Sequence, residues 1–138
     1  MAADSPTVED VIARWPADSG QALRAFTTLK DHLGGIPEVL TEFQARPGIS
    51  YSLRGISQKS ADDRPLFVMI DIIVDEPRWL SVCFYQDMIS DPEERGDFVP
   101  GGLLGENGLC FDVEDDNQML LDYVIARIDE ACQAAGSV

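Results

Sequence analysis

The chain has 138 residues, of which 45% are hydrophobic and 25% are charged, so we expect one folded domain over residues 1–138. Its 25 acidic and 10 basic residues give a net charge of −15, which opposes binding to nucleic acids and anionic membranes. No apolar run approaches the roughly 20 residues that span a bilayer. The start MAADSPTVEDVIARW lacks the basic and apolar regions of a signal peptide. We therefore expect a cytoplasmic protein with neither nucleic-acid nor membrane partners.

Two helices are predicted at the N-terminal end. The first covers residues 6–15 and ends before Pro16, because a residue that precedes proline disfavours the helical conformation. It belongs to a short N-terminal segment, residues 1–17, which we expect to be loosely attached. The second helix covers residues 19–33, where apolar residues recur at helical spacing, and two glycines then supply its end.

The middle of the chain has the pattern of two β-hairpins. Residues 38–46 and 49–56 flank a Pro-Gly pair, which fits the central positions of a type II turn. Two apolar, β-branched and aromatic runs, residues 65–74 and 79–86, are joined by the turn residues DEPR. Both runs are apolar on both faces, as in central strands that are covered on each side or covered by a partner chain.

The segment SDPEERGDFVPGGLLGENG, residues 90–108, interrupts the strand pattern. Five carboxylates, five glycines and two prolines give it no helix or strand period, so it is predicted to be a long loop that wraps over the sheet. Asp91 is expected to cap one helical turn within it. A short strand at residues 109–113 and a helix at residues 117–135 complete the chain.

The element order predicts an α+β fold. Strands gathered in the middle with helices at both ends are typical of an antiparallel sheet with helices packed on it. We expect a meander of about five strands, with the N-terminal helices and the long C-terminal helix on one face.

Three stretches carry a resemblance to a known group: RPLFVMIDII, RWLSVCFYQDMISDPEERGDFVPGG and the closing helix. Over roughly residues 46–135 the chain resembles a family of small acidic bacterial proteins whose function is uncharacterised. Its order of helix, meander and helix is also weakly similar to that of the YdhG/YjbR-like domains. Neither resemblance implies an activity, a cofactor or a catalytic residue.

The cysteines and the single histidine offer little for catalysis. Cys83, Cys110 and Cys132 each lie in an apolar pattern without CxxC spacing, so we expect three buried thiols in a reducing compartment. His32 has no second histidine to complete a zinc site. We predict no catalytic residue of this kind and no cofactor.

The acidic loop is the candidate cation site. Oxygen-rich loops with glycine turns suit Ca²⁺ or Mg²⁺, and the candidate ligands are Asp91, Glu93, Glu94 and Asp97. The loop lacks the ligand order of an EF-hand and the GK[ST] ending of a phosphate loop. A solvated turn is the alternative interpretation.

Asp71 is unusual because it interrupts the apolar run FVMIDIIV. An unpaired buried charge is costly, so a partner is expected, and Arg54 on the preceding strand is the nearest candidate for an ion pair. Exposure on an open sheet face and a functional carboxylate are the alternatives.

Aromatic residues gather in the predicted meander. Trp79, Tyr85, Tyr51 and Phe67 are the candidate ligand or interface residues, because helices on one face would leave some of them on the other. From this uncovered face we expect a homodimer, with Trp79 and Tyr85 as anchors.

The preferred functional hypothesis is a non-catalytic binding or interaction module that uses the sheet face and residues 87–108. A cation-assisted enzyme that uses carboxylates of the acidic loop is the first alternative. An acidic chaperone or adaptor for a basic partner protein is the second.

Overall fold

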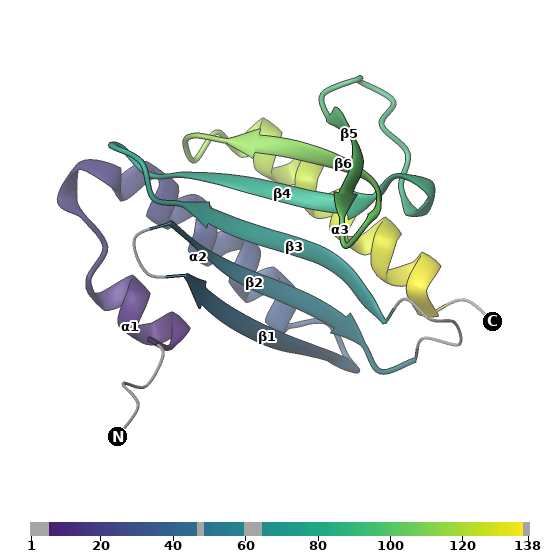
Figure 1. Ribbon diagram of the computed structural model, residues 1–138, viewed down its shortest axis with the longest axis horizontal. Helices are drawn as coiled ribbons and strands as arrows, with labels where there is room; N and C mark the ends of the chain where they lie inside the picture. Colours follow the sequence, from purple (N-terminus) through teal and green to yellow (C-terminus); the bar gives the residue numbers. More distant parts are fainter. Residues whose placement is uncertain (1–5, 47–48, 60–64, 137–138) are drawn as a thin grey trace.

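The computed structural model describes residues 6–46, 49–59 and 65–136 and has an α+β fold (Figure 1). Six antiparallel strands form one sheet in the order β1-β2-β3-β4-β6-β5, so the predicted fold class is confirmed. In chain order the elements are α1 (Val8–Ala13), the 3-10 turn η1 (Ala17–Ser19), α2 (Gly20–Gly34), β1 (Val39–Arg46), β2 (Ser50–Ser57), β3 (Leu66–Ile73), β4 (Trp79–Tyr85), the 3-10 turn η2 (Gln86–Met88), β5 (Asp97–Leu103), β6 (Glu106–Val113) and α3 (Gln118–Gly136).

The N-terminal segment packs on the domain through α1. Thr7 and Asp10 form a capping box that satisfies backbone N–H groups at the start of this helix. Val11 is 4% exposed, and the Trp15 ring stacks on Phe26 of α2 with 5.9 Å between ring centroids. Residues 8–19 are therefore attached to the core, and residues 1–5 lie outside the described part of the chain.

Helices α2 and α3 lie side by side on one face of the sheet and form the core with it (Figure 1). Successive side chains of a strand point to opposite faces, so alternate residues of β3 and β4 face these helices. The largest side chains buried there are aromatic and branched aliphatic residues: Phe26, Leu29, Leu33, Phe67, Ile70, Ile72, Leu80, Phe84, Phe111 and Ile128.

A glycine lets α2 approach β2 closely. A Cβ atom on Gly55 would lie 2.8 Å from Val68 Cγ1 and 2.9 Å from Leu33 Cδ1, closer than packed carbon atoms allow. The strand register also shifts between Gly55 and Ile56. A larger residue at position 55 would therefore force the side chains of Val68 and Leu33 to shift.

The number of strands is six, because part of the predicted acidic loop forms β5. This strand reads DFVPGGL and is exposed along its length except at Leu103. It lies at the sheet edge, where proline and glycine are tolerated, so it lacks the alternating pattern that identifies a strand in a sequence. Its pairing with β6 is irregular between Val99 and Leu103.

The prediction of three free thiols is wrong for two of them. Cys83 on β4 and Cys110 on β6 are directly opposite in register and form a disulfide. Strand β6 pairs with β4 on one side and with β5 on the other. This pairing joins residues far apart in the sequence, so the spacing of the cysteines does not indicate the disulfide. The expected cytoplasmic location thereby loses the support drawn from free thiols, since disulfides persist mainly in oxidising compartments.

Within the described residues, no helix combines the length and the apolar composition required to cross a membrane. The predicted Pro-Gly turn, residues 47–48, falls outside the described part of the chain.

Candidate functional site

One face of the sheet has no helix over it among the described elements, and Figure 1 views the molecule from this side, with α2 and α3 behind the strands. We call this surface the open face. Register and alternation assign its residues: Leu40, Glu42, Gln44 and Arg46 on β1, Ser50, Ser52, Arg54 and Ile56 on β2, Leu66, Met69, Asp71 and Ile73 on β3, Trp79, Ser81, Cys83 and Tyr85 on β4, and Gly108, Cys110 and Asp112 on β6.

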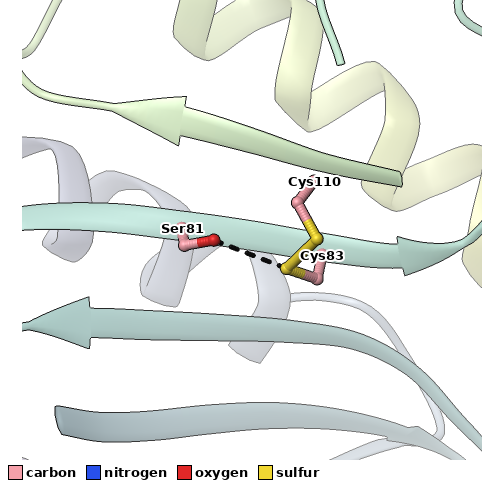
Figure 2. Close-up of a disulfide and its surroundings, with 3 residues drawn as sticks. All are labelled: Ser81, Cys83 and Cys110. Atoms are coloured by element: carbon pink, nitrogen blue, oxygen red, sulfur yellow. Dashed lines mark hydrogen bonds between the residues drawn. A yellow bond between two sulfur atoms is a disulfide. The ribbon is translucent and has the colours of Figure 1, made fainter. Parts of the chain in front are cut away.

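The second half of β5 covers one end of the open face. Leu103, only 1% exposed, packs with Cys83 and Tyr85 and forms a small apolar cluster separate from the main core. Cys83 belongs to this cluster, and Cys110 packs against it. Figure 2 shows the disulfide between these two cysteines and the Ser81 side chain beside it. The Ser81 hydroxyl oxygen lies 3.4 Å from the sulfur of Cys83. The covered end is therefore packed within the chain, and the candidate surface is the rest of the open face.

A polar slot lies at the uncovered end, across β1, β2 and β3. It has a cavity volume of about 80 Å³. Its lining is polar apart from one methionine and consists of Gln44, Arg46, Ser50, Ser52, Arg54, Met69 and Asp71. The slot can hold a polar group that offers hydrogen-bond acceptors to the arginines or a donor to the carboxylate.

Asp71 lies at the inner wall of this slot. Its Oδ1 is buried and has no hydrogen-bond partner in the described chain. Burial raises the pKa of the Asp71 carboxyl, while the Ser52 hydroxyl and the guanidinium groups of Arg54 and Arg46 act in the opposite direction and offset only part of the rise. A buried carboxylate without full compensation is costly, so this position is not optimised for the stability of a lone chain.

The two arginines of the slot form no ion pair with any residue in the described part of the chain. Among the described residues, no carboxylate lies within 4.0 Å of a charged nitrogen of Arg46 or Arg54. Arg54 instead donates from Nε to the Ser52 hydroxyl at 3.3 Å. The expected Asp71–Arg54 pair is therefore not formed as a direct contact, although both residues share the open face and interact electrostatically.

The opposite side of the open face is acidic. Burial raises the pKa of Asp112 on β6, and the nearby carboxylates of Asp97 and Glu114 raise it further. The open face is thus basic toward β1 and β2 and acidic toward β6 and β5. Sequence reasoning singled out neither Arg46 nor Asp112, yet the alternation of side chains along β1 and β6 places both away from the core.

The four aromatic candidates are divided between the two faces. Trp79 lies half-buried on the open face, where its indole N–H donates to Asp75 at 2.7 Å. Tyr85 belongs to the same face but is 4% exposed beneath β5. Phe67 is fully buried in the main core, and Tyr51 packs against that core beside Phe43. Only Trp79 is therefore available on the uncovered surface.

Asp91 is occupied in fixing the acidic loop. Its carboxylate accepts hydrogen bonds from the backbone N–H groups of Arg95 and Gly96 at 3.0 and 2.8 Å, and from the hydroxyl of Tyr123 on α3. Burial raises the pKa of Asp91, but these hydrogen bonds outweigh burial and hold it below its usual value. Asp91 caps a turn rather than a helix.

The other candidate cation ligands do not converge with Asp91. Glu93 pairs with Arg95 at 3.1 Å, and Asp97 lies at the start of β5 facing the acidic side of the sheet. Glu94 is exposed in the turn. Within the described residues, no three His, Cys, Asp or Glu side chains come together in an arrangement that could hold a metal ion.

The remaining candidate nucleophile and base lie apart from the open face. His32 Nε2 is 2.7 Å from Asp129 on the helical layer. Cys132 on α3 lines a cavity of about 670 Å³ beside the Lys59–Glu38 ion pair. Burial, followed by the nearby Asp129 carboxylate, raises the pKa of the Cys132 thiol, so it stays protonated and weakly nucleophilic at neutral pH.

No family model, curated protein or solved structure matches the chain.

Proposed function

We propose that this chain is a non-catalytic binding module whose binding surface is the open face of the sheet, bordered by the β5–β6 hairpin. The observation that carries the proposal is a set of charged groups on an uncovered sheet face, Arg46, Arg54 and Asp71, for which the described residues supply no ion pair within 4.0 Å. Natural proteins depart from local rules of stability mainly where function requires it, and unpaired polar groups are what a partner can satisfy.

The nature of the surrounding groups favours binding over catalysis. The single histidine is engaged with Asp129 on the helical layer, and both cysteines of the open face are joined in a disulfide. Serine nucleophiles are usually activated by a histidine or lysine base, and the described lining of the slot holds neither: it consists of arginines, serines, an amide, a methionine and the carboxylate of Asp71. A screen for turnover with and without Mg²⁺ tests the rival hypothesis of a cation-assisted enzyme.

Site-specific photo-cross-linking tests the proposed surface. A photoreactive amino acid replaces Gln44 or Asp112, which are exposed on opposite sides of the open face. The matched control replaces Met119, which is 74% exposed on α3. We expect cross-linked products of defined mass from positions 44 and 112 in cells, and none from position 119. Equal labelling at all three positions, or no product at positions 44 and 112, would contradict the proposal.

A further inference from the structure

We infer that the open face binds a second copy of this chain, packed face to face about a two-fold axis parallel to the strands. In this arrangement the β1–β2 side of each copy covers the β4–β6 side of the other. The inference rests on the proposed function, because it names the partner of the same surface. Three features of the open face support it: the charge distribution, the placement of exposed apolar residues and the available area.

The charge distribution of the open face is complementary to itself. Arg46 and Arg54 lie on the β1–β2 side, where Glu42 is the only acidic residue that the register places on the face. Asp112 lies on the other side, close enough to Asp97 and Glu114 for their charges to raise its pKa. A two-fold axis parallel to the strands brings basic groups over acidic ones on both sides of the axis, while Asp71, on the middle strand β3, lies near its own copy.

The alternative axis is disfavoured by the same charges. A two-fold axis within the sheet plane but perpendicular to the strands would place β1 over β1 and β6 over β6. The strands that carry the arginines would then face each other, and β6 with Asp112 would face β6 of the other copy, which brings like charges closer in a partly desolvated interface. The chain already carries a net charge of −15, so association requires local complementarity to overcome the overall repulsion.

Exposed apolar residues fall in complementary places about the same axis. Leu40 on β1 is 53% exposed and lies beside Ile56, at the sheet end where β2 finishes and β3 begins. The β5–β6 hairpin overhangs the opposite corner of that same end (Figure 1). It carries Val99 at 36% and Leu104 at 60% exposure. A two-fold rotation about an axis parallel to the strands exchanges the two sides of the sheet but leaves each strand end at the same end of the dimer. The β5–β6 hairpin of each copy therefore contacts Leu40 and Ile56 of the other.

The area of the open face suits a weak, reversible dimer. Five strands spaced about 4.8 Å apart, each of about eight residues rising about 3.3 Å, give a face of roughly 24 by 26 Å. This corresponds to about 600 Å² from each copy before the end beneath β5 is subtracted, so the contact is smaller than the roughly 800 Å² per partner of a standard stable interface. We therefore expect association at micromolar to millimolar concentration rather than an obligate dimer.

A charge-swap experiment tests both the dimer and its axis. One variant carries Arg46→Glu and Arg54→Glu, and the other carries Asp112→Lys. Each variant alone places like charges opposite each other and should weaken the dimer about tenfold or more. Mixed together, the two variants restore opposite charges on both sides of the axis, so the heterodimer should form with affinity close to that of the wild type. Sedimentation velocity measures the species, and circular dichroism shows that each variant is folded.

The apolar contact supplies a second test that is independent of charge. Leu104 has a φ of 52°, a conformation that asparagine tolerates well, so Leu104→Asn should preserve the hairpin and weaken the dimer several-fold. Met119→Asn is the matched control, because Met119 is exposed on α3 away from the open face. This control should leave the dimer dissociation constant unchanged.

The outcomes separate the inference from the proposed function. A wild-type chain that stays at 15.2 kDa up to millimolar concentration would overturn the dimer, as would a mixture of charge variants that fails to associate. Photo-cross-links from positions 44 and 112 to a different species would then leave the binding module standing with another partner. The absence of such cross-links would remove the proposed function itself.

Discussion

The two faces of the sheet differ although they share the same strands. On β3, Val68, Ile70 and Ile72 face the helices and are completely buried. Their neighbours Met69 and Asp71 face outward and are only half-buried. The helix face is therefore optimised for packing within one chain, whereas the open face retains polar groups and partial exposure. Adjacent residues of one strand thus lie in different environments.

The largest expected effect distinguishes the two faces directly. Ile70→Ala removes a fully buried side chain between the sheet and the helices, so it should reduce the free energy of unfolding by about 4 kcal/mol. Met69→Ala, one residue away on the open face, should cost about 1 kcal/mol or less. Urea unfolding followed by circular dichroism measures both. Equal losses would show that the faces are packed alike.

Breaking the disulfide should have the next largest effect. Cys83 and Cys110 are separated by 27 residues, and removing a crosslink of this length destabilises a folded chain by roughly 3 kcal/mol. The Cys83→Ala/Cys110→Ala variant should show this loss under oxidising conditions, and reduction of the wild type should reproduce it. Cys132→Ala serves as the control and should leave the effect of the reductant unchanged. A wild type that is insensitive to reductant would contradict the prediction.

Asp91 should stabilise the protein in a pH-dependent way. Because its folded-state pKa lies below the unfolded value, its contribution is present above the unfolded pKa and is lost as the pH falls through the folded pKa. Asp91→Asn weakens three hydrogen bonds and should cost about 1–2 kcal/mol at neutral pH, with a smaller cost in acid. Unfolding measured across acidic and neutral pH tests this, with Glu94→Gln as a control in the same turn. A cost that stays constant with pH would contradict it.

Replacing Asp71 should have the smallest effect on the free energy of unfolding, and it should stabilise rather than destabilise the protein. The pKa of Asp71 is raised by burial, so the native state binds a proton more readily than the unfolded state, and stability falls as the pH rises through the window between the two pKa values. Asp71→Asn removes the uncompensated charge and should raise the stability at neutral pH by about 1 kcal/mol. Below both pKa values the two proteins should be equally stable. A destabilised variant at neutral pH would show that the charge has a partner.

The sequence supports the fold better than the site because the two depend on different signals. The helices and β1 to β4 follow local periodicity, and their predicted ends lie within one or two residues of those observed. The sequence does not predict strand β5, because its proline and glycines interrupt the alternation of apolar and polar residues. Its backbone hydrogen bonds to β6 form only in the folded chain. The Cys83–Cys110 disulfide depends on β6 pairing with β4, a long-range relation that spacing does not encode.

The candidate site shows the same limit. Asp71 was recognised because a charge in an apolar run is a local anomaly. Arg46 and Asp112 look like ordinary surface residues in the sequence. Only the strand register shows that they lie on opposite sides of one sheet face. The aromatic candidates lie on different faces of the sheet, because side chains alternate between the faces along each strand. Phe67 points into the core and Trp79 lies on the open face.

The disulfide also makes the polypeptide between Cys83 and Cys110 a closed ring that contains the acidic turn and β5. Arg95 lies in this ring and its side chain is exposed, so a trypsin-like protease that opens the turn can cut the bond after it. A single cut there leaves the N-terminal and C-terminal parts covalently joined through sulfur. The nicked protein would migrate as two fragments on a gel only after reduction, and α3 would remain tethered to β4 in its native place.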